Sequence, residues 1–249
     1  MPGHRKIFGY RGAGKLPTTR WTMVINAGQD ATVERDKALA ELCAMYWTPV
    51  YGFIRARGRR AEEARDLTQG FFTTRLIEKN DVAAADPTRG RFRNWLLTAV
   101  SSYLANDLEM ARAKKRIPGS EIISIDTAEV EGQCPIQIGH DTTPERVFER
   151  RWAMVLLGKA LQKLEESYKK RGDEKLFAKM LPLLTGMGAE SHRAIAEELG
   201  MREETFNVAL SRCRSRFQER IREEIAETVV HQDEIEDELR HLHSGLRSH

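Results

Sequence analysis

Polar side chains that could bind the edges of DNA bases recur at helical spacing late in the chain. Asn207, Ser211 and Arg212 offer an amide, a hydroxyl and a guanidinium group on one helical face, and Arg214 and Arg216 follow within the next turn. Amide and guanidinium groups form paired hydrogen bonds to bases in the major groove, and arginine also neutralises phosphates. The pattern therefore predicts a helix that binds nucleic acid. A solvated helix with ordinary surface arginines is the alternative.

A short helix and a tight turn precede these residues. Ile195, Ala196 and Leu199 mark the inner face of a first helix, and Gly200 follows where a left-handed turn residue is required. The apolar face of the second helix consists of Phe206, Ala209, Leu210, Cys213 and Phe217. Two helices joined so closely predict a helix-turn-helix, whose second helix enters the DNA major groove. Helical hairpins of this kind also bind proteins, so the pattern alone leaves both functions open.

A second group of residues combines cations with aromatic rings on an expected helix over residues 91–116. Near its start stand Arg89, Arg91, Phe92, Arg93, Asn94 and Trp95, and at its end stand Arg112, Lys114, Lys115 and Arg116. Cations neutralise phosphates, and aromatic faces stack on unpaired bases, so the group indicates a site for single-stranded nucleic acid. Phe92 lies on the apolar stripe of the helix and is expected in the core, whereas Trp95 suits either the core or the surface.

A polar patch is expected on a helix over residues 62–78. Arg65, Asp66 and Gln69 lie on one side of this helix, and Leu67 and Phe71 lie on the other. A patch of this kind is plain surface more often than it is an interface, so by itself it predicts no partner.

Catalytic, cofactor and metal chemistry find little support. The stretch Gly9–Lys15 imitates a phosphate-binding loop, but Leu16 stands where that loop needs Ser or Thr, which argues against a nucleotide-dependent enzyme. Glu238 and His241 have metal-ligand spacing, but a di-metal bundle needs that motif twice, so we expect both residues to be solvated. No nucleophile, base and orienting acid can be assembled. We therefore expect no enzyme activity, no cofactor and no metal.

Charge and cysteine usage limit the class of protein further. After residue 221 the chain holds eight acidic residues and three arginines, so this segment carries −5 and residues 1–221 carry +8 of the total of +3. A basic body with an acidic tail fits a nucleic-acid-binding protein whose tail has a separate task. Cys43, Cys134 and Cys213 have no paired spacing, and no apolar run is long enough to cross a membrane, so we expect a cytoplasmic location.

Helical periodicity, interrupted by Gly and Pro, predicts an all-α chain with two small helical domains. The expected parts are an N-terminal arm at 1–30, a first domain at 31–117, an irregular linker at 118–143, a second domain containing the helix-turn-helix at 144–221, and an acidic extension at 222–249. Thr143 can cap the first helix of the second domain, and Pro144 suits its first position. In the first domain, Pro49 is expected to kink or split a helix over residues 34–57.

With these segments in this order, the chain resembles bacterial RNA polymerase sigma factors of the extracytoplasmic-function (ECF) group. Residues 66–72 look like the D-L-x-Q-x-x-F segment of region 2 of the family. Residues 91–96 followed by Asp107-Leu108 look like its F-R-x-W-L and D-x-L helix, and residues 194–214 look like the region 4 helix-turn-helix that ends in R-x-R. The resemblance extends over roughly residues 36–222, in order and at family spacing, which is more specific than any one motif.

The resemblance implies a non-catalytic transcription initiation subunit that binds the β′ clamp helices and β flap of core RNA polymerase and recognises promoter DNA. It assigns the polymerase contact to Arg65, Asp66, Gln69 and Phe72. It assigns recognition and melting of the −10 element to the loop 79–91 and the helix after it, with Arg89, Arg91, Arg93, Asn94, Trp95, Arg112, Lys114, Lys115 and Arg116. It assigns the −35 element to Arg202, Thr205, Asn207, Val208, Ser211, Arg212, Arg214 and Arg216. The linker would thread polymerase toward the active centre.

This chain departs from the family pattern in three places. Phe206 replaces a small aliphatic residue and needs extra room, Gly70 stands where an acid is common, and the acidic tail after Arg222 exceeds a minimal ECF factor. We expect the tail to contact polymerase or a regulator, or to shield the basic recognition helix. The resemblance also implies control by sequestration. The alternative function is a sigma-like interaction module held by an anti-sigma factor or another regulatory protein.

Overall fold

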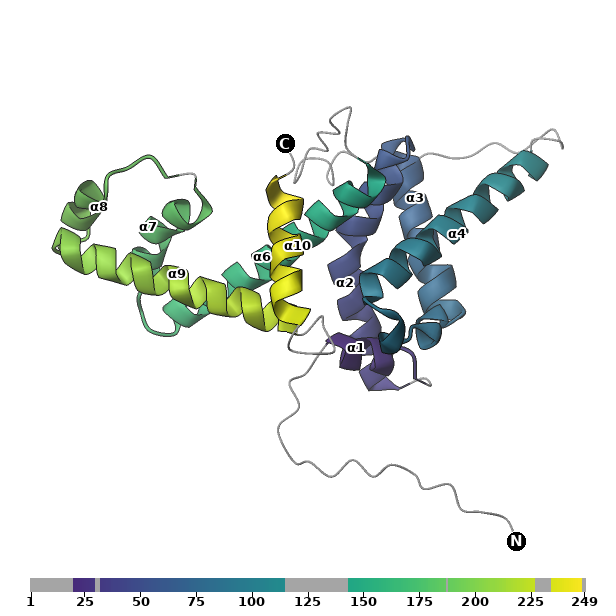
Figure 1. Cartoon of the computed structure of the whole chain (residues 1–249), viewed down its shortest axis with the longest axis horizontal. Coiled ribbons are helices and arrows are strands. Elements are labelled where there is room, and N and C mark those ends of the chain that lie inside the picture. Colours follow the sequence, from purple (N-terminus) through teal and green to yellow (C-terminus); the bar gives the residue numbers. More distant parts are fainter. Residues whose placement is uncertain (1–19, 30–31, 115–142, 187, 227–233, 248–249) are drawn as a thin grey trace, which may run out of the picture.

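The computed structural model describes residues 20–29, 32–114, 143–186, 188–226 and 234–247 (Figure 1). All regular secondary structure in these ranges is helical, which confirms the all-α prediction. The Gly9–Lys15 stretch, Lys115, Arg116, Cys134 and the expected linker from its start to residue 142 lie outside the described residues. No helix in the described ranges is long and apolar enough to span a bilayer.

The first group of helices surrounds the long helix α2, which is most deeply buried over residues 49–54. Its elements are α1 (Arg20–Ala27), α2 (Val33–Ala56), α3 (Ala61–Phe71), the π-helix η1 (Phe72–Glu78), the 3₁₀ turns η2 (Asp81–Ala84) and η3 (Pro87–Arg89), and α4 (Phe92–Lys114). Thr32 caps α2, since its hydroxyl accepts a hydrogen bond of 3.1 Å from the backbone N–H of Arg35. Pro49 lies buried inside α2, and the helix continues through it, so the expected split is absent. Packing of this segment in the core outweighs the backbone hydrogen bond that proline cannot donate.

Helix α1 occupies part of the segment that the sequence predicted as an arm. Val24 and Ala27 are buried in the same apolar cluster as α2. The side-chain amide of Asn80 donates a 3.0 Å hydrogen bond to the carbonyl of Gly28, directly after α1. A Cβ atom on Gly28 would lie 2.9 Å from the Cα atom of Ala83, so the chain after α1 packs closely on η2. Residues 20–28 are therefore part of the folded body.

The second group of helices contains the helix-turn-helix. Its elements are α6 (Pro144–Lys169), α7 (Glu174–Thr185), α8 (His192–Glu198), α9 (Glu203–Ala226) and α10 (Glu234–Arg247). As predicted, Thr143 caps α6: its hydroxyl accepts a 3.3 Å hydrogen bond from the N–H of Arg146, and Pro144 occupies the first turn.

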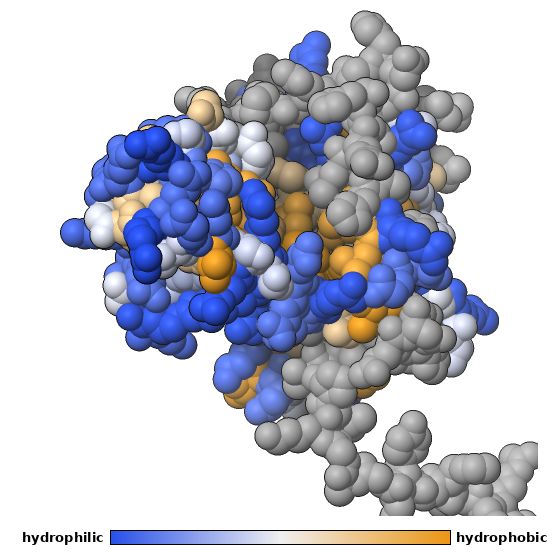
Figure 2. Space-filling model, turned by 60° about the vertical axis from the view of Figure 1, so that its left-hand side comes forward, coloured by the Kyte–Doolittle hydropathy of each residue, from blue (hydrophilic) through white to orange (hydrophobic). Residues whose placement is uncertain are grey.

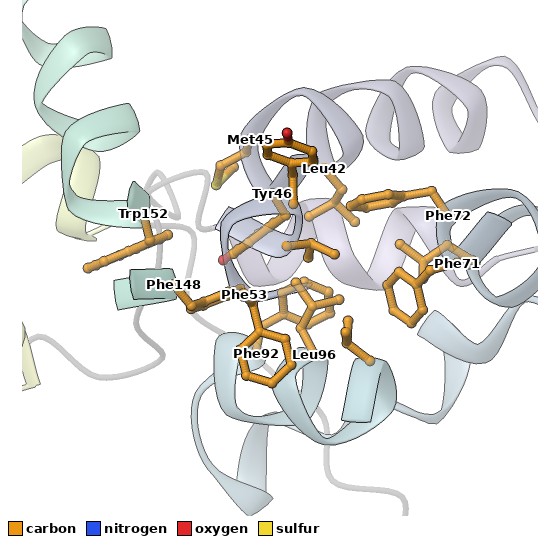
Figure 3. Close-up of a cluster of buried hydrophobic side chains, with 14 of the residues drawn as sticks. Leu42, Met45, Tyr46, Phe53, Phe71, Phe72, Phe92, Leu96, Phe148 and Trp152 are labelled. Atoms are coloured by element: carbon orange, nitrogen blue, oxygen red, sulfur yellow. The ribbon is translucent and has the colours of Figure 1, made fainter. Parts of the chain in front are cut away.

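Helix α6 belongs to both of the apolar clusters that stabilise the fold. Phe148, Trp152 and Leu156 join the cluster formed by α1–α4, whereas Leu164 and Tyr168 join a second cluster with α7, α8 and α9. The rings of Phe148 and Tyr46 stack with centroids 6.4 Å apart, which ties α6 to α2 (Figure 3). The expected domain boundary at residue 144 thus precedes a helix that both clusters share.

Helix α10 is folded onto the rest of the molecule rather than exposed as a tail. It packs against α6 and the end of α9, on the side of the second group of helices that faces the first group (Figure 1). Leu242 is buried in the first cluster, and Ile235 and Leu239 pack partly against it. Glu238, which we expected to be solvated, is 1% exposed, because it lies on this inner face of the helix and pairs with two arginines.

Candidate nucleic-acid interface

The helix-turn-helix has the local geometry that its sequence predicts. Ser191 caps α8 by accepting a 3.2 Å hydrogen bond from the N–H of Ala194. Gly200 has a φ of 67°, the left-handed value that favours glycine, and the next N–H, of Met201, donates to the carbonyl of Ala196 at 3.0 Å. These bonds end α8 and turn the chain within a few residues into α9.

A buried inner face fixes α9 against the second apolar cluster. The buried members are Ile195, Ala196, Phe206, Leu210 and Cys213, and the half-buried members are Leu199, Ala209 and Phe217, as the periodicity predicted. Phe206 is 0% exposed and meets the ring of His192 edge-on, with centroids 5.7 Å apart, so the cluster has the room that this large side chain needs. Burial raises the pKa of the Cys213 thiol, as expected of a core cysteine.

The opposite face of α9 is exposed and polar. The exposed residues are Arg202, just before the helix, and Thr205, Asn207, Val208, Ser211, Arg212 and Arg214. Figure 2 shows that this end of the molecule is largely hydrophilic. The side-chain oxygen of Asn207 lies 2.7 Å from Nδ1 of His192, which orients the amide. Sequence reasoning did not single out His192, because this contact joins two helices across the turn.

Arg216 is exposed, but its side chain points in a direction that the sequence did not suggest. The guanidinium group of Arg216 turns toward α6, where it lies 3.4 Å from the hydroxyl of Tyr168. Ser215 is exposed one turn after Ser211 and donates a 3.2 Å hydrogen bond to its carbonyl. Spacing by four residues from Ser211 could have indicated Ser215, whereas only the packing of α9 on α6 places Arg216.

The start of α4 brings together the predicted arginines but pairs two of them with carboxylates. Arg93 is 4% exposed, and its guanidinium group lies 2.6 Å from Glu238, 3.1 Å from Glu149 and 4.3 Å above the ring of Trp152. Arg91 pairs with the other carboxylate oxygen of Glu238. The sequence placed Arg91 and Arg93 at DNA, but in this structure their charges are matched within the protein.

The other residues predicted to contact the −10 element lie around this point. The side chain of Arg89 is 86% exposed, and Asn94 is exposed. Phe92 is buried, as expected, and Trp95 is half-buried, with its ring stacked on that of Phe92 at 5.2 Å. Arg112 and Lys114 lie in α4, but the structure describes only the backbone at these two positions.

The loop before α4 is ordered by a local turn. The carboxylate of Asp86 accepts hydrogen bonds from the N–H of Thr88 at 2.8 Å and from its hydroxyl at 2.7 Å. The Thr88 hydroxyl bond, followed by the backbone bond, lowers the pKa of Asp86 below its usual 3.8. The charged form of Asp86 therefore holds the turn that presents Arg89.

Two of the four residues predicted to contact polymerase at the polar patch on α3 are exposed. Asp66 and Gln69 face solvent, and Arg65 is half-buried. Phe72 is 3% exposed and stacks on Trp47 with centroids 5.6 Å apart, so it is a core residue and cannot contact a partner directly. The chain changes from α- to π-helix at Phe72, and two successive phenylalanines face the core there.

Gly70, which stands in this patch where an acidic residue is common in the ECF family, allows close packing of α3 and α4. A Cβ atom at Gly70 would lie 2.5 Å from the hydroxyl oxygen of Tyr103 on α4. The absence of a side chain therefore lets α4 approach α3, and an acidic residue would not fit in this packing.

In the described part of the chain, no group of three or more His, Cys, Asp or Glu side chains is placed to hold a metal ion. No protein-family model, no curated protein and no solved structure matches the chain.

Proposed function

We propose that this chain is a promoter-recognition subunit of bacterial RNA polymerase, similar to ECF sigma factors. The observation that carries the proposal is the outer face of α9. Asn207, Ser211 and Arg212 are exposed together on the second helix of a helix-turn-helix, whose inner face is fixed in an apolar cluster. Rigid presentation of amide, hydroxyl and guanidinium donors is what direct contact with bases in the major groove requires.

Recognition of the −35 element would begin at this face. Asn207 has its side-chain oxygen against His192, which directs its NH₂ group away from α8 and toward a base acceptor. Arg212 can donate two hydrogen bonds to a guanine, and the exposed Val208 suits a thymine methyl group.

The first group of helices would supply the other two functions of such a subunit. Exposed Asp66 and Gln69 would contact polymerase, while Arg89, Asn94 and the half-buried Trp95 would engage the −10 element. In this role the chain positions DNA and polymerase and performs no catalysis.

The test adds the full-length chain to bacterial core polymerase and sequences the transcripts made from a library of genomic fragments. We expect transcripts that start downstream of one shared sequence motif. Asn207→Ala and Arg212→Ala should alter that motif, and Asp66→Ala with Gln69→Ala should weaken co-purification with polymerase. Glu165→Ala, which removes an exposed charge on α6, should change neither. No association with polymerase would refute the proposal.

A sigma-like interaction module held by a regulatory protein is the second candidate. It is favoured by the pairing of Arg91 and Arg93 with Glu238, which closes part of the expected DNA site. Stable binding to polymerase without any promoter-specific transcript would support this candidate over the first.

A further inference from the structure

We infer that α10 is an autoinhibitory element, in which Glu238 occupies the guanidinium groups that nucleic acid would otherwise bind at the start of α4. The identity of the competing ligand as promoter DNA rests on the proposed function. The covering of Arg91 and Arg93 by α10, called the cover below, rests only on contacts within the chain, such as that between Arg93 and Glu238, 145 residues apart in sequence.

Carboxylates of the same chain occupy the guanidinium groups of Arg91 and Arg93. One oxygen of Glu238 pairs with Arg91 and the other lies 2.6 Å from Arg93, so one carboxylate engages two guanidinium groups. Glu149 of α6 adds a second carboxylate at 3.1 Å from Arg93. Two cations and two anions are thus balanced. A nucleic-acid phosphate has the same charge and the same hydrogen-bond acceptors as the carboxylate that it would replace.

The position of α10 agrees with a cover for this site. Its inner face carries Ile235, Glu238, Leu239 and Leu242 at helical spacing, and the carboxylate lies in the middle of this apolar stripe. The outer face bears the exposed charges Glu236 and Asp237. Because Glu238 lies on the same face as these packed apolar residues, it is directed at Arg91 and Arg93.

Binding of α10 and binding of nucleic acid at these arginines exclude each other. A guanidinium group that is buried against Glu238 cannot also contact a phosphate, so a ligand of Arg91 and Arg93 must displace α10. By linkage, loss of α10 from this position must raise the affinity for that ligand. The attraction within a buried ion pair is largely offset by the cost of removing both charges from water. Replacement of Glu238 by a phosphate, which pairs with the arginines again, is therefore energetically feasible.

The location of the cover differs from the shield that the sequence suggested. The acidic extension was expected to mask the basic recognition helix. In the structure, α10 reaches α9 near its C-terminal end, where Glu236 pairs with Arg222. Asn207, Ser211 and Arg212 remain exposed. The device therefore acts on the site at α4 and leaves the helix-turn-helix accessible.

The experiment measures binding of the full-length chain to a fluorescein-labelled single-stranded DNA of mixed sequence by anisotropy, at several salt concentrations. Glu238→Gln keeps the size of the side chain and removes its charge, so α10 loses its ion pairs with Arg91 and Arg93 and nucleic acid can displace it more easily. We expect at least about tenfold tighter binding at low salt. We also expect a salt dependence of log K steeper by about 1.4, since each phosphate contact on a single strand contributes about 0.7.

Glu236→Gln is the matched control, because it removes the same charge from an exposed position of the same helix, where the partner is Arg222. It should change affinity less than threefold. Adding Arg91→Ala to Glu238→Gln should abolish most of the gain. Equal effects of Glu238→Gln and Glu236→Gln would overturn the inference. If Glu238→Gln does not fold, Glu238→Met in the full-length chain, which continues the apolar stripe of α10, tests the same point, and unchanged affinity in that variant would also overturn the inference.

The two proposals can fail separately. Promoter-specific transcription by the wild-type chain, together with no gain in Glu238→Gln, would reject the cover and leave the proposed function intact. A gain in Glu238→Gln without any association with polymerase would support the cover and reject the proposed function.

Discussion

Gly70 shows how one residue sets the distance between two helices. Because a Cβ atom there would lie 2.5 Å from the Tyr103 hydroxyl, Gly70→Ala must displace the Tyr103 side chain or push α3 and α4 apart. We expect a loss of about 1–3 kcal/mol in unfolding free energy, as for other overpacked sites. Removal of the hydroxyl by Tyr103→Phe leaves the next ring atom 3.7 Å away, so in that background Gly70→Ala should be neutral or stabilising. Urea unfolding of the four proteins gives the answer, and an equal loss in both backgrounds would contradict this packing role.

Asp86 provides a prediction at low pH. Hydrogen bonds from Thr88 lower the pKa of Asp86 from 3.8. The charged carboxylate therefore stabilises the turn fully at a pH above the pKa of the unfolded chain. This contribution is lost as the pH falls through the lower pKa of the folded chain. The carboxyl group should therefore titrate below pH 3.8 when followed by NMR. Thr88→Ala removes the hydroxyl but keeps the N–H, and it should move the midpoint part of the way back. A midpoint that does not respond to Thr88→Ala would exclude this cause.

Arg212 and Arg216 form a natural pair for testing base contacts, since both are exposed residues of α9 but only the guanidinium group of Arg216 is directed at Tyr168 of α6. If Arg212 binds a base with two hydrogen bonds, Arg212→Ala should cost about 1–3 kcal/mol of discrimination at one base pair of the promoter. Arg216→Ala should leave discrimination unchanged, because its guanidinium group lies against Tyr168. Competition binding of the polymerase complex to single-base promoter variants measures both. Equal weakening on every promoter would make Arg212 a phosphate contact.

At the scale of elements, α6 connects the two clusters as one continuous helix. Trp152 lies in the first cluster, and it also supports the guanidinium group of Arg93. Trp152→Ala should cost about 3–5 kcal/mol, since a large cavity replaces a fully buried ring. Hydrogen exchange should show weaker protection along α6 and in the α7–α9 cluster as well as in α1–α4. Loss of protection confined to α1–α4 would mean that the two clusters unfold independently. Phe177→Ala in α7 makes the matching cavity in the second cluster, and the same exchange measurement applies to it.

Elements differ in how far the sequence could predict them. The start of α6 at Pro144 and the turn at Gly200 depend on a few adjacent residues, so both were predicted correctly. The burial of α10 and of Phe72 depends on contacts with other helices, which local periodicity does not contain. The same reason explains α1, whose short apolar face becomes recognisable only once it packs on α2 and η2.

At the scale of the whole molecule, the two candidate DNA sites lie on different groups of helices. One is the exposed face of α9, and the other, at the start of α4, is partly closed by α10. Each site alone offers few contacts, so the chain without polymerase should prefer its promoter over an unrelated duplex by less than about tenfold, compared with about 10³ or more for typical specific complexes. Anisotropy with both duplexes, with and without core polymerase, tests this expectation. High specificity of the isolated chain would contradict it.

The sequence by itself determined the all-α class, the cap at Thr143, the turn at Gly200 and the polar outer face of α9, because each depends on residue preferences within one or two helical turns. The tertiary structure alone decided which charges are available. Arg91 and Arg93 have the same residue types and spacing whether they face DNA or a carboxylate, and only the packing of α10 onto α6 brings Glu238 to them. Electrostatic pairing depends on distance in space, and a separation of 145 residues hides that distance from any local pattern.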